Sequence, residues 1–169
     1  ADADAELERG QDALGDRAGD SEGGVRHALT HPDGVHTHRP AEDFDILAFN
    51  ISAELVYTNV LNCIDLAGIS IHAADRCEDD PLVGAGGHCA YNPEPLADFI
   101  DFFVMGDGEE VISEITTVVD GWRVAGKPSG TRTDVLSQLA HIPGVYVPAL
   151  YEAQYDGNEL IEVKPTGEQ

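Results

Sequence analysis

The stretch VGAGGHCAYNPEPLADFIDFFVMGDGEEVI, Val83–Ile112, contains two glycine-marked turns on either side of a short proline-rich segment. Gly86 and Gly87 end the first apolar run, and Gly106 and Gly108 follow the second. Apolar residues then recur at helical spacing. Short apolar runs that alternate with helices are typical of a parallel sheet with right-handed crossovers. Each glycine turn is therefore either a cradle for a ligand or a tight bend between a strand and a helix.

The residues before this stretch continue the alternation. The run DFDILAFNIS predicts a buried strand over about Asp45–Ser52, because it is apolar and rich in β-branched and aromatic residues. Residues 53–67 then have apolar side chains at near-helical spacing, and Gly68 follows where a glycine commonly terminates a helix. Cys63 lies among apolar neighbours in this predicted helix, so we expect its side chain to be buried.

The opening stretch itself predicts two strands and a short helix. The strands are expected over residues 81–87 and 101–106, which are the apolar runs that the glycines follow. Between them, the sequence NPEPLADFI predicts a short helix. Asn92 is the expected N-cap of this helix, and Pro93 is expected at its first position.

The rest of the chain predicts two helices and a hairpin. One helix is expected over residues 107–126, with acidic residues in its first turn, and another over residues 131–142. Thr133 or Asp134 is the expected cap of the second helix. The final run, GVYVPALYEAQYDGNELIEVKP, has two alternating segments around DGN and predicts a β-hairpin.

These elements predict an α/β fold with a parallel sheet flanked by helices. Three strands are expected within residues 45–124, whereas doubly wound sheets of this kind usually have about five. We therefore expect the sheet to be incomplete at its N-terminus. The expected organisation is an acidic, linker-like segment over residues 1–41, an α/β domain over residues 42–142, and a hairpin extension over residues 143–169.

The N-terminal segment is rich in Asp, Glu, Ala and Gly, a composition that predicts little ordered structure. It contains His31, His36 and His38 within THPDGVHTHRP. Three neighbouring histidines suggest a metal site. No carboxylate or cysteine lies at a fixed helical offset from them, however, so a polar loop is the favoured interpretation.

Charge and composition exclude several classes of protein. The net charge is −23 with only 9 Lys and Arg residues, which argues against binding to nucleic acid. No run of 18 apolar residues is present, so no membrane span is expected. The first residues lack the basic and apolar regions of a signal peptide, and we expect a cytoplasmic protein. Cys63, Cys77 and Cys89 form no CxxC pattern, which favours free thiols over a zinc or iron–sulfur site.

The loops that follow the predicted strands are the expected ligand site. The carboxyl ends of parallel strands meet at one edge of a sheet, where ligands bind in open α/β folds. Glycine allows a ligand to approach the backbone closely. The expected cofactor-binding residues are Ser52, Gly86, Gly87, His88, Gly106, Gly108 and Glu109.

The chemistry of this rim limits the class of ligand. Asp107, Glu109 and Glu110 would repel a phosphate, so a ligand with hydroxyl or amide donors suits the second turn better. Neither turn has the G-x-G-x-x-G or P-loop pattern. His88 and Cys89 are neighbours, but adjacent side chains rarely face one substrate together. No catalytic or metal-ligating residue is therefore expected in this chain.

Three segments identify a family by resemblance: FDILAFNISAELVYTNVLNCIDLAGI, DDPLVGAGGHCAYNPEPLADFIDFFVMGDGEEVISEI and GVYVPALYEAQY. They closely resemble the N-terminal region of a family of bacterial radical SAM proteins, over about Arg39–Val163. The most specific motifs are GGH-x-x-x-NPEP and GDGEE, in which Asp107 replaces the second residue of the family's usual Gly-Glu-Gly-Glu turn. Members are large iron–sulfur oxidoreductases in which a cobalamin-binding-like domain precedes the radical SAM barrel.

The resemblance implies a flavodoxin-like sheet and a domain excised from a longer protein. The CxxxCxxC motif that binds a [4Fe–4S] cluster and acts on S-adenosylmethionine is expected only in the full-length protein, beyond Gln169. The radical SAM domain of the same protein is therefore the implied partner. The implied role of this chain is to position a corrin or part of the substrate over that catalytic core.

Cobalamin is the cofactor that the resemblance suggests for this domain. Cobalamin domains share D-x-H-x-x-G, S-x-L and a later Gly-Gly. Gly86–Gly87 and Ser52 match, although Leu55 lies one place too far, and D-x-H-x-x-G is absent. No histidine is thus placed by motif to ligate cobalt. The alternatives are a docking module that binds no cofactor and, less favoured, an independent flavodoxin-like nucleotide binder.

Overall fold

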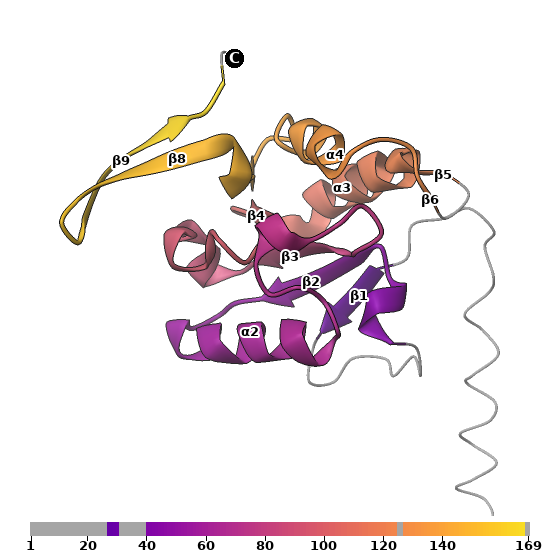
Figure 1. Ribbon diagram of the computed structural model, residues 1–169, viewed down its shortest axis with the longest axis horizontal. Coiled ribbons are helices and arrows are strands. Elements are labelled where there is room, and N and C mark those ends of the chain that lie inside the picture. Colours follow the sequence, from indigo (N-terminus) through magenta and orange to yellow (C-terminus); the bar gives the residue numbers. More distant parts are fainter. Residues whose placement is uncertain (1–26, 31–39, 125–126, 168–169) are drawn as a thin grey trace, which may run out of the picture.

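The computed structural model describes residues 27–30, 40–124 and 127–167. Its main sheet has five strands in the spatial order β1-β2-β3-β4-β7 (Figure 1). Strands β1 to β4 are parallel, and β7 pairs antiparallel with β4 at the edge of the sheet. The strands are β1 His27–Thr30, β2 Ile46–Asn50, β3 Leu82–Gly86, β4 Phe102–Val104 and β7 Val145–Tyr146.

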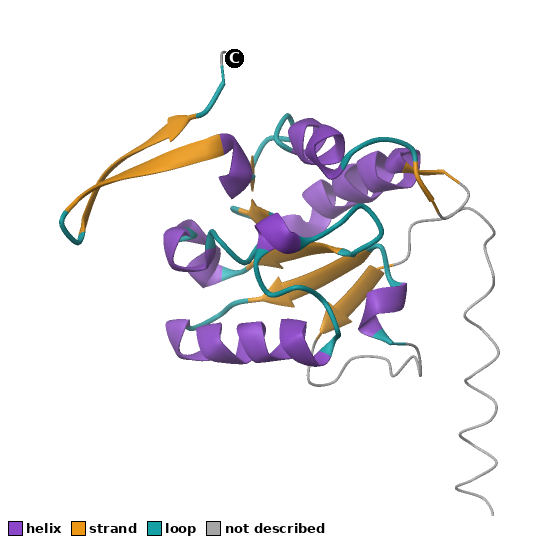
Figure 2. Ribbon diagram, in the orientation of Figure 1, coloured by secondary structure: helices purple, strands orange, loops and turns teal. Residues whose placement is uncertain are grey.

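Helices cover both faces of this sheet. Helix α2, Tyr57–Leu66, lies on one side, and α3, Gly108–Trp122, and α4, Arg132–Leu139, lie on the other (Figures 1 and 2). A small two-stranded sheet, β5 Arg123–Val124 and β6 Lys127–Pro128, follows α3. The 3-10 turns are η1 Ala41–Asp43, η2 Glu54–Val56, η3 Ala73–Asp75, η4 His88–Tyr91, η5 Glu94–Leu96 and η6 Pro148–Leu150.

Each face of the sheet has its own buried apolar cluster, since successive strand residues point to opposite sides. On one face Val60 and Ile64 of α2 pack against Leu47, Phe49, Val83, Ala85 and Phe103. On the other, α3 and α4 pack against Ile46, Leu82 and Phe102. Both faces are therefore buried, which explains why the strands are apolar runs without strict alternation.

The strands and the two long helices expected between residues 45 and 124 are confirmed. Gly68 follows α2 with a φ of +74°, the backbone conformation expected of a terminating glycine. The expected burial of Cys63 is wrong, because this side chain is exposed. Val60 and Ile64 form the buried face of α2, and Cys63 lies about 100° around the helix from Ile64.

Strand β1 corrects the expectation for residues 1–41. His27–Thr30 pairs in parallel with β2, so this part of the segment belongs to the sheet and is not a linker. It supplies a fourth parallel strand on the side where we expected the sheet to be incomplete. A four-residue strand has too few residues for a recognisable period, and its pairing with β2 is what stabilises it. His31, His36 and His38 lie outside the described residues.

Two helix starts also differ from expectation. The segment after β3 forms the 3-10 turns η4 and η5 in place of an α-helix, and Pro93 is the N-cap residue of η5 where Asn92 was expected to cap. A second proline, Pro95, disfavours the α conformation at the preceding residue, Glu94, and so opposes a continuous helix. Helix α4 is capped by Thr131, which exchanges hydrogen bonds with Asp134 at the third helical position; the predicted caps Thr133 and Asp134 were therefore wrong.

The C-terminal hairpin is confirmed as β8, Tyr151–Asp156, and β9, Glu159–Pro165. It projects from the rest of the chain (Figure 1). The residues at Val145–Tyr146 were expected to belong to the hairpin, but they form β7 and complete the main sheet. The 3-10 turn η6, which begins at Pro148, separates β7 from the first strand of the hairpin, β8.

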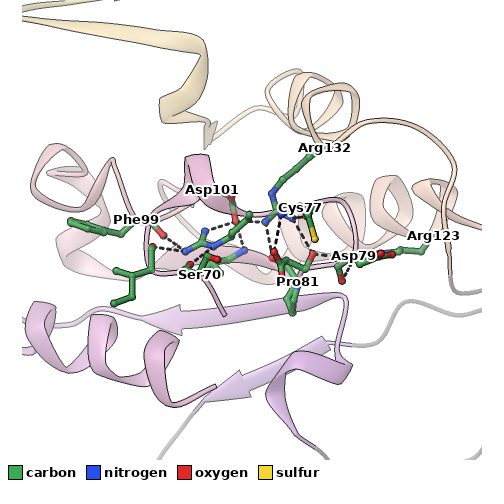
Figure 3. A network of polar contacts seen from close by, with 12 residues as sticks. Ser70, Cys77, Asp79, Pro81, Phe99, Asp101, Arg123 and Arg132 are labelled. Carbon is green, nitrogen blue, oxygen red and sulfur yellow. Dashed lines mark hydrogen bonds and ion pairs between the residues drawn. The ribbon is translucent and has the colours of Figure 1, made fainter. Parts of the chain in front are cut away.

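The amino ends of β3 and β4 are held by a buried ion-pair network centred on Asp101 (Figure 3). Its Oδ2 atom accepts hydrogen bonds from Arg76 Nη1 and Arg132 Nη2, each at 2.8 Å, and from the Val83 amide at 2.6 Å. Asp101 is only 3% exposed. Charges removed from water in this way are stable only when they are paired and hydrogen-bonded.

The same arginines also bind the loops around the network. Arg76 donates to the carbonyl oxygens of Ser70, Ile71 and Phe99, and Arg132 donates to those of Cys77, Asp80 and Pro81. Burial lowers the pKa of the Arg76 guanidinium from its usual value, and the nearby Asp101 carboxylate acts in the opposite direction. The network therefore fixes the loops that precede β3 and β4, and with them the positions of both strands.

Candidate functional site

A pocket of about 760 Å³ opens where β2, β3 and β4 end. All seven residues that the sequence predicted at this rim line it: Ser52, Gly86, Gly87, His88, Gly106, Gly108 and Glu109. The structure thus brings the three loops together, while their role in binding stays a prediction. The volume lies within the range of small-molecule sites in proteins, about 300–1,000 Å³.

The floor of the pocket is the sheet face on which α3 packs. Ala48, Gly84 and Gly86 lie on this face and have the smallest side chains possible there. The ring of Phe102 occupies the space that a Cβ on Gly84 would need, with Cε2 2.7 Å from that position. Phe102 therefore covers Gly84, and the backbone is open to a ligand beside Ala48 and Gly86, which are only partly buried.

Gly87 is required by the backbone itself. Its φ is +94°, and a Cβ there would lie 2.8 Å from the Ile51 carbonyl oxygen and against the side chain of Asn50. The Ile51 amide donates to Gly86 O at 2.7 Å, and the Cys89 amide donates to Ile51 O at 3.0 Å. These bonds join the loop after β2 to the loop after β3. Gly87 is therefore a structural glycine as well as a lining residue.

Gly86 differs from its neighbour. A Cβ on Gly86 would make only ordinary contacts, 3.8 Å from the Cβ and the carbonyl oxygen of Val104. Its φ lies outside the left-handed region. A larger side chain at Gly86 would therefore fit the strand and project into the pocket, which makes this position suited to testing the site.

The rim at the second turn is acidic and exposed. Gly106 has a φ of +117°, and Asp107 is the N-cap residue of α3, although its side chain makes no capping hydrogen bond. Glu109 lies in the first turn of α3. Across the pocket, His88 and Ser52 are also exposed. Carboxylates accept hydrogen bonds, so this side of the rim suits a ligand with N–H or O–H donors.

The lining also includes residues that the sequence did not single out for the site, among them Asn50, Tyr91 and Ile112. Asn50 is two residues beyond Ala48 on the same strand, so the period of two would have placed it on the floor. Ile112 lies four residues after Gly108, one helical turn away. Tyr91 ends the 3-10 turn η4, and no sequence period indicates its position.

A second pocket, of about 920 Å³, lies between the hairpin and the Asp101 network. Its lining contains none of the seven predicted residues. Tyr146 donates a hydrogen bond to Glu94 there, at 3.0 Å, and its ring lies 5.0 Å from that of Tyr151. Burial, together with this bond to Glu94, raises the pKa of the Tyr146 phenol above its usual range.

Across the part of the chain that the structure describes, no cluster of three His, Cys, Asp or Glu side chains is arranged to hold a metal ion. Nor does any described helix combine the length and hydropathy that crossing a membrane requires. Cys63, Cys77 and Cys89 are free cysteines.

The fold and the pocket define an α/β domain with an open site at the carboxyl edge of a mostly parallel sheet. Residues 18–148 match the family described as "Radical SAM proteins, N-terminal", and the chain belongs to this family. The match begins earlier than the resemblance expected from about Arg39 and includes β1. No curated protein and no solved structure matches the chain. The flavodoxin-like assignment therefore stays a prediction.

Proposed function

We propose that this domain holds a corrin, or a planar part of the substrate, at the carboxyl ends of its strands and presents it to a radical SAM catalytic core. The observation that supports this most is the convergence of the loops after β2, β3 and β4 on one pocket. This edge is where ligands bind in open α/β sheets. The [4Fe–4S] cluster and S-adenosylmethionine would be bound by another part of the protein.

The lining of the pocket fits the chemistry of a corrin, which is a broad, flat ring that carries amide groups around its edge. Ala48 and Gly86 would allow such a ring to lie close to the backbone. Asp107 and Glu109 accept hydrogen bonds from amide N–H groups. The same carboxylates repel phosphates, which disfavours a free nucleotide as the ligand.

The residues that would hold the corrin are thus those of the floor and the acidic rim. His88 is the one histidine among the lining residues, and it is exposed. Because D-x-H-x-x-G is absent, the proposal places the corrin by its ring face and its amides, without a histidine ligand. Bound cobalamin would supply a cobalt centre for group or electron transfer.

Titration with hydroxocobalamin, followed by corrin absorption, tests the proposal. We expect a saturable spectral shift with the wild-type domain and roughly tenfold weaker binding in Gly86→Val, because the added side chain fills the floor. Gly121→Val is the matched control, since Gly121 is exposed on α3, has open space around it and does not line the pocket. The absence of any shift with the wild-type domain would contradict the proposal.

The hairpin favours a second candidate function, docking onto the radical SAM domain without a cofactor. Tyr155, Leu160 and Ile161 are 56%, 40% and 60% exposed on strands that project from the sheet (Figure 1). Exposed apolar side chains that lie together mark interaction surfaces. If docking is the whole role, hydroxocobalamin will not bind, and Ile161→Asp will weaken association with a separately expressed radical SAM region.

A further inference from the structure

Tyr91 is a lining residue of the pocket that neither the sequence nor the family match assigns. It is the last residue of η4, which follows the first glycine turn, and its side chain is 68% exposed. Large aromatic side chains are usually buried in part, because they contribute most when their area is removed from water. The ring of Tyr91 is instead largely exposed to solvent at the pocket.

The ring reaches from the loop after β3 to the turn after β4. Its hydroxyl oxygen is 3.9 Å from the position of a Cβ on Gly106, and no other atom outside the neighbouring residues lies within 4 Å of that position. Gly106 has no side chain to displace the ring, and its φ of +117° disfavours any other residue. The second glycine turn therefore leaves space beside Tyr91.

The hydroxyl of Tyr91 makes no hydrogen bond to any residue that the structure describes, in contrast to Tyr146, which donates to Glu94. The phenol is thus not held by a polar partner within that part of the chain. An exposed aromatic ring beside a floor of small apolar residues offers a flat face to a flat ligand. Stacking of an aromatic face on a flat conjugated ring removes apolar area of both from water, which is favourable.

We propose that Tyr91 is the residue that stacks on the ring of the bound ligand, so that the pocket selects planar ring systems. This inference rests on the proposed function. The floor would contact one part of the ring and Tyr91 another. Stacking needs the aromatic face and not the hydroxyl. Tyr91→Ala, which removes the ring, and Tyr91→Phe, which removes only the hydroxyl, should therefore have different effects on binding.

The test compares Tyr91→Ala, Tyr91→Phe and Tyr155→Ala in hydroxocobalamin titrations of the domain. We expect roughly tenfold weaker binding in Tyr91→Ala, the size expected when a stacked ring is lost, and nearly unchanged binding in Tyr91→Phe. Tyr155→Ala removes another exposed tyrosine, 56% exposed and outside this pocket, and should bind like the wild type. Equal melting temperatures show that all three variants fold.

The outcomes are distinguishable. If the wild-type domain binds and Tyr91→Ala binds equally well, the inference about Tyr91 is overturned and the proposed function stands. The inference is also overturned if Tyr91→Phe loses as much affinity as Tyr91→Ala, because the hydroxyl and not the ring would then be the contact. If the wild-type domain does not bind, the proposed function fails, and the inference fails with it.

Discussion

The two ends of the main sheet are built in opposite ways. At the amino ends of β3 and β4, the carboxylate of Asp101 is buried and paired with Arg76 and Arg132 (Figure 3). At the carboxyl ends, β3 stops at Gly86, Gly106 follows β4, and the loops surround an open pocket. The amino ends are held by buried ion pairs and hydrogen bonds, whereas the carboxyl ends have small residues and exposed loops.

The difference indicates how the domain tolerates a glycine-rich site. Glycine contributes little packing and loses much conformational freedom on folding. The loops at the amino end are instead held by three arginines, each of which donates to backbone carbonyls: Arg76, Arg123 and Arg132. Stability is thereby concentrated at one end, and the other is left free for a ligand. Substitutions at the amino end should consequently lower the free energy of unfolding more than substitutions at the carboxyl end.

The largest effect is expected at Asp101. Asp101→Ala leaves Arg76 and Arg132 buried without their carboxylate and should lower the free energy of unfolding by about 3–5 kcal/mol. Urea denaturation at neutral pH measures this loss. Asp98→Ala, which removes an exposed acid three residues earlier, is the control and should change stability by no more than about 0.5 kcal/mol. A loss at Asp101 no larger than the control would show that the network does not hold this end.

A smaller effect separates the two glycines at the end of β3. Gly87→Ala should destabilise the domain by about 1–3 kcal/mol, because φ is +94° and the Cβ would meet Ile51 O. Gly86→Ala should leave the unfolding free energy unchanged or raise it by up to about 1 kcal/mol, since its backbone suits alanine. Melting curves of both variants test this difference. Equal losses of unfolding free energy in the two variants would mean that the backbone at Gly86, in the pocket floor, is as constrained as the backbone at Gly87, in the turn.

The smallest effect on stability is expected at the capping box that starts α4. Arg132, which belongs to the Asp101 network, is the first residue of this helix. Hydrogen bonds from the backbone and side chain of Thr131 lower the pKa of Asp134. A carboxylate with a lowered folded pKa stabilises the protein above its unfolded pKa, about 3.9, and this contribution is lost as pH falls through the folded value. Asp134→Asn should therefore differ from wild type most at neutral pH and converge with it in acid.

The control for this pH dependence is Asp120→Asn, which removes an exposed carboxylate on α3 that takes no part in a cap. It corrects for the change in net charge. Urea midpoints measured from neutral pH down to about pH 3 give the comparison. A constant difference between Asp134→Asn and wild type across that range would contradict the assigned role of the cap.

The sequence predicted the carboxyl end better than the amino end. Glycine after an apolar run is a local signal, and it placed Gly86 and Gly106 on one rim because parallel strands end at the same edge. The Asp101 network joins residues 25 and 31 positions apart, and no local period indicates such pairing. Tyr91 was missed because it ends the 3-10 turn η4, between a predicted strand and the predicted short helix, where no sequence period indicates the position of a side chain.

Amide hydrogen exchange, measured with and without saturating hydroxocobalamin, shows which segments of the chain the ligand covers. We expect slower exchange in the three segments that line the pocket, residues 50–52, 86–91 and 106–112, and no change at the amino end, residues 70–80 and 98–101. Slower exchange confined to the amino end or to the hairpin, or no change in any segment, would contradict it.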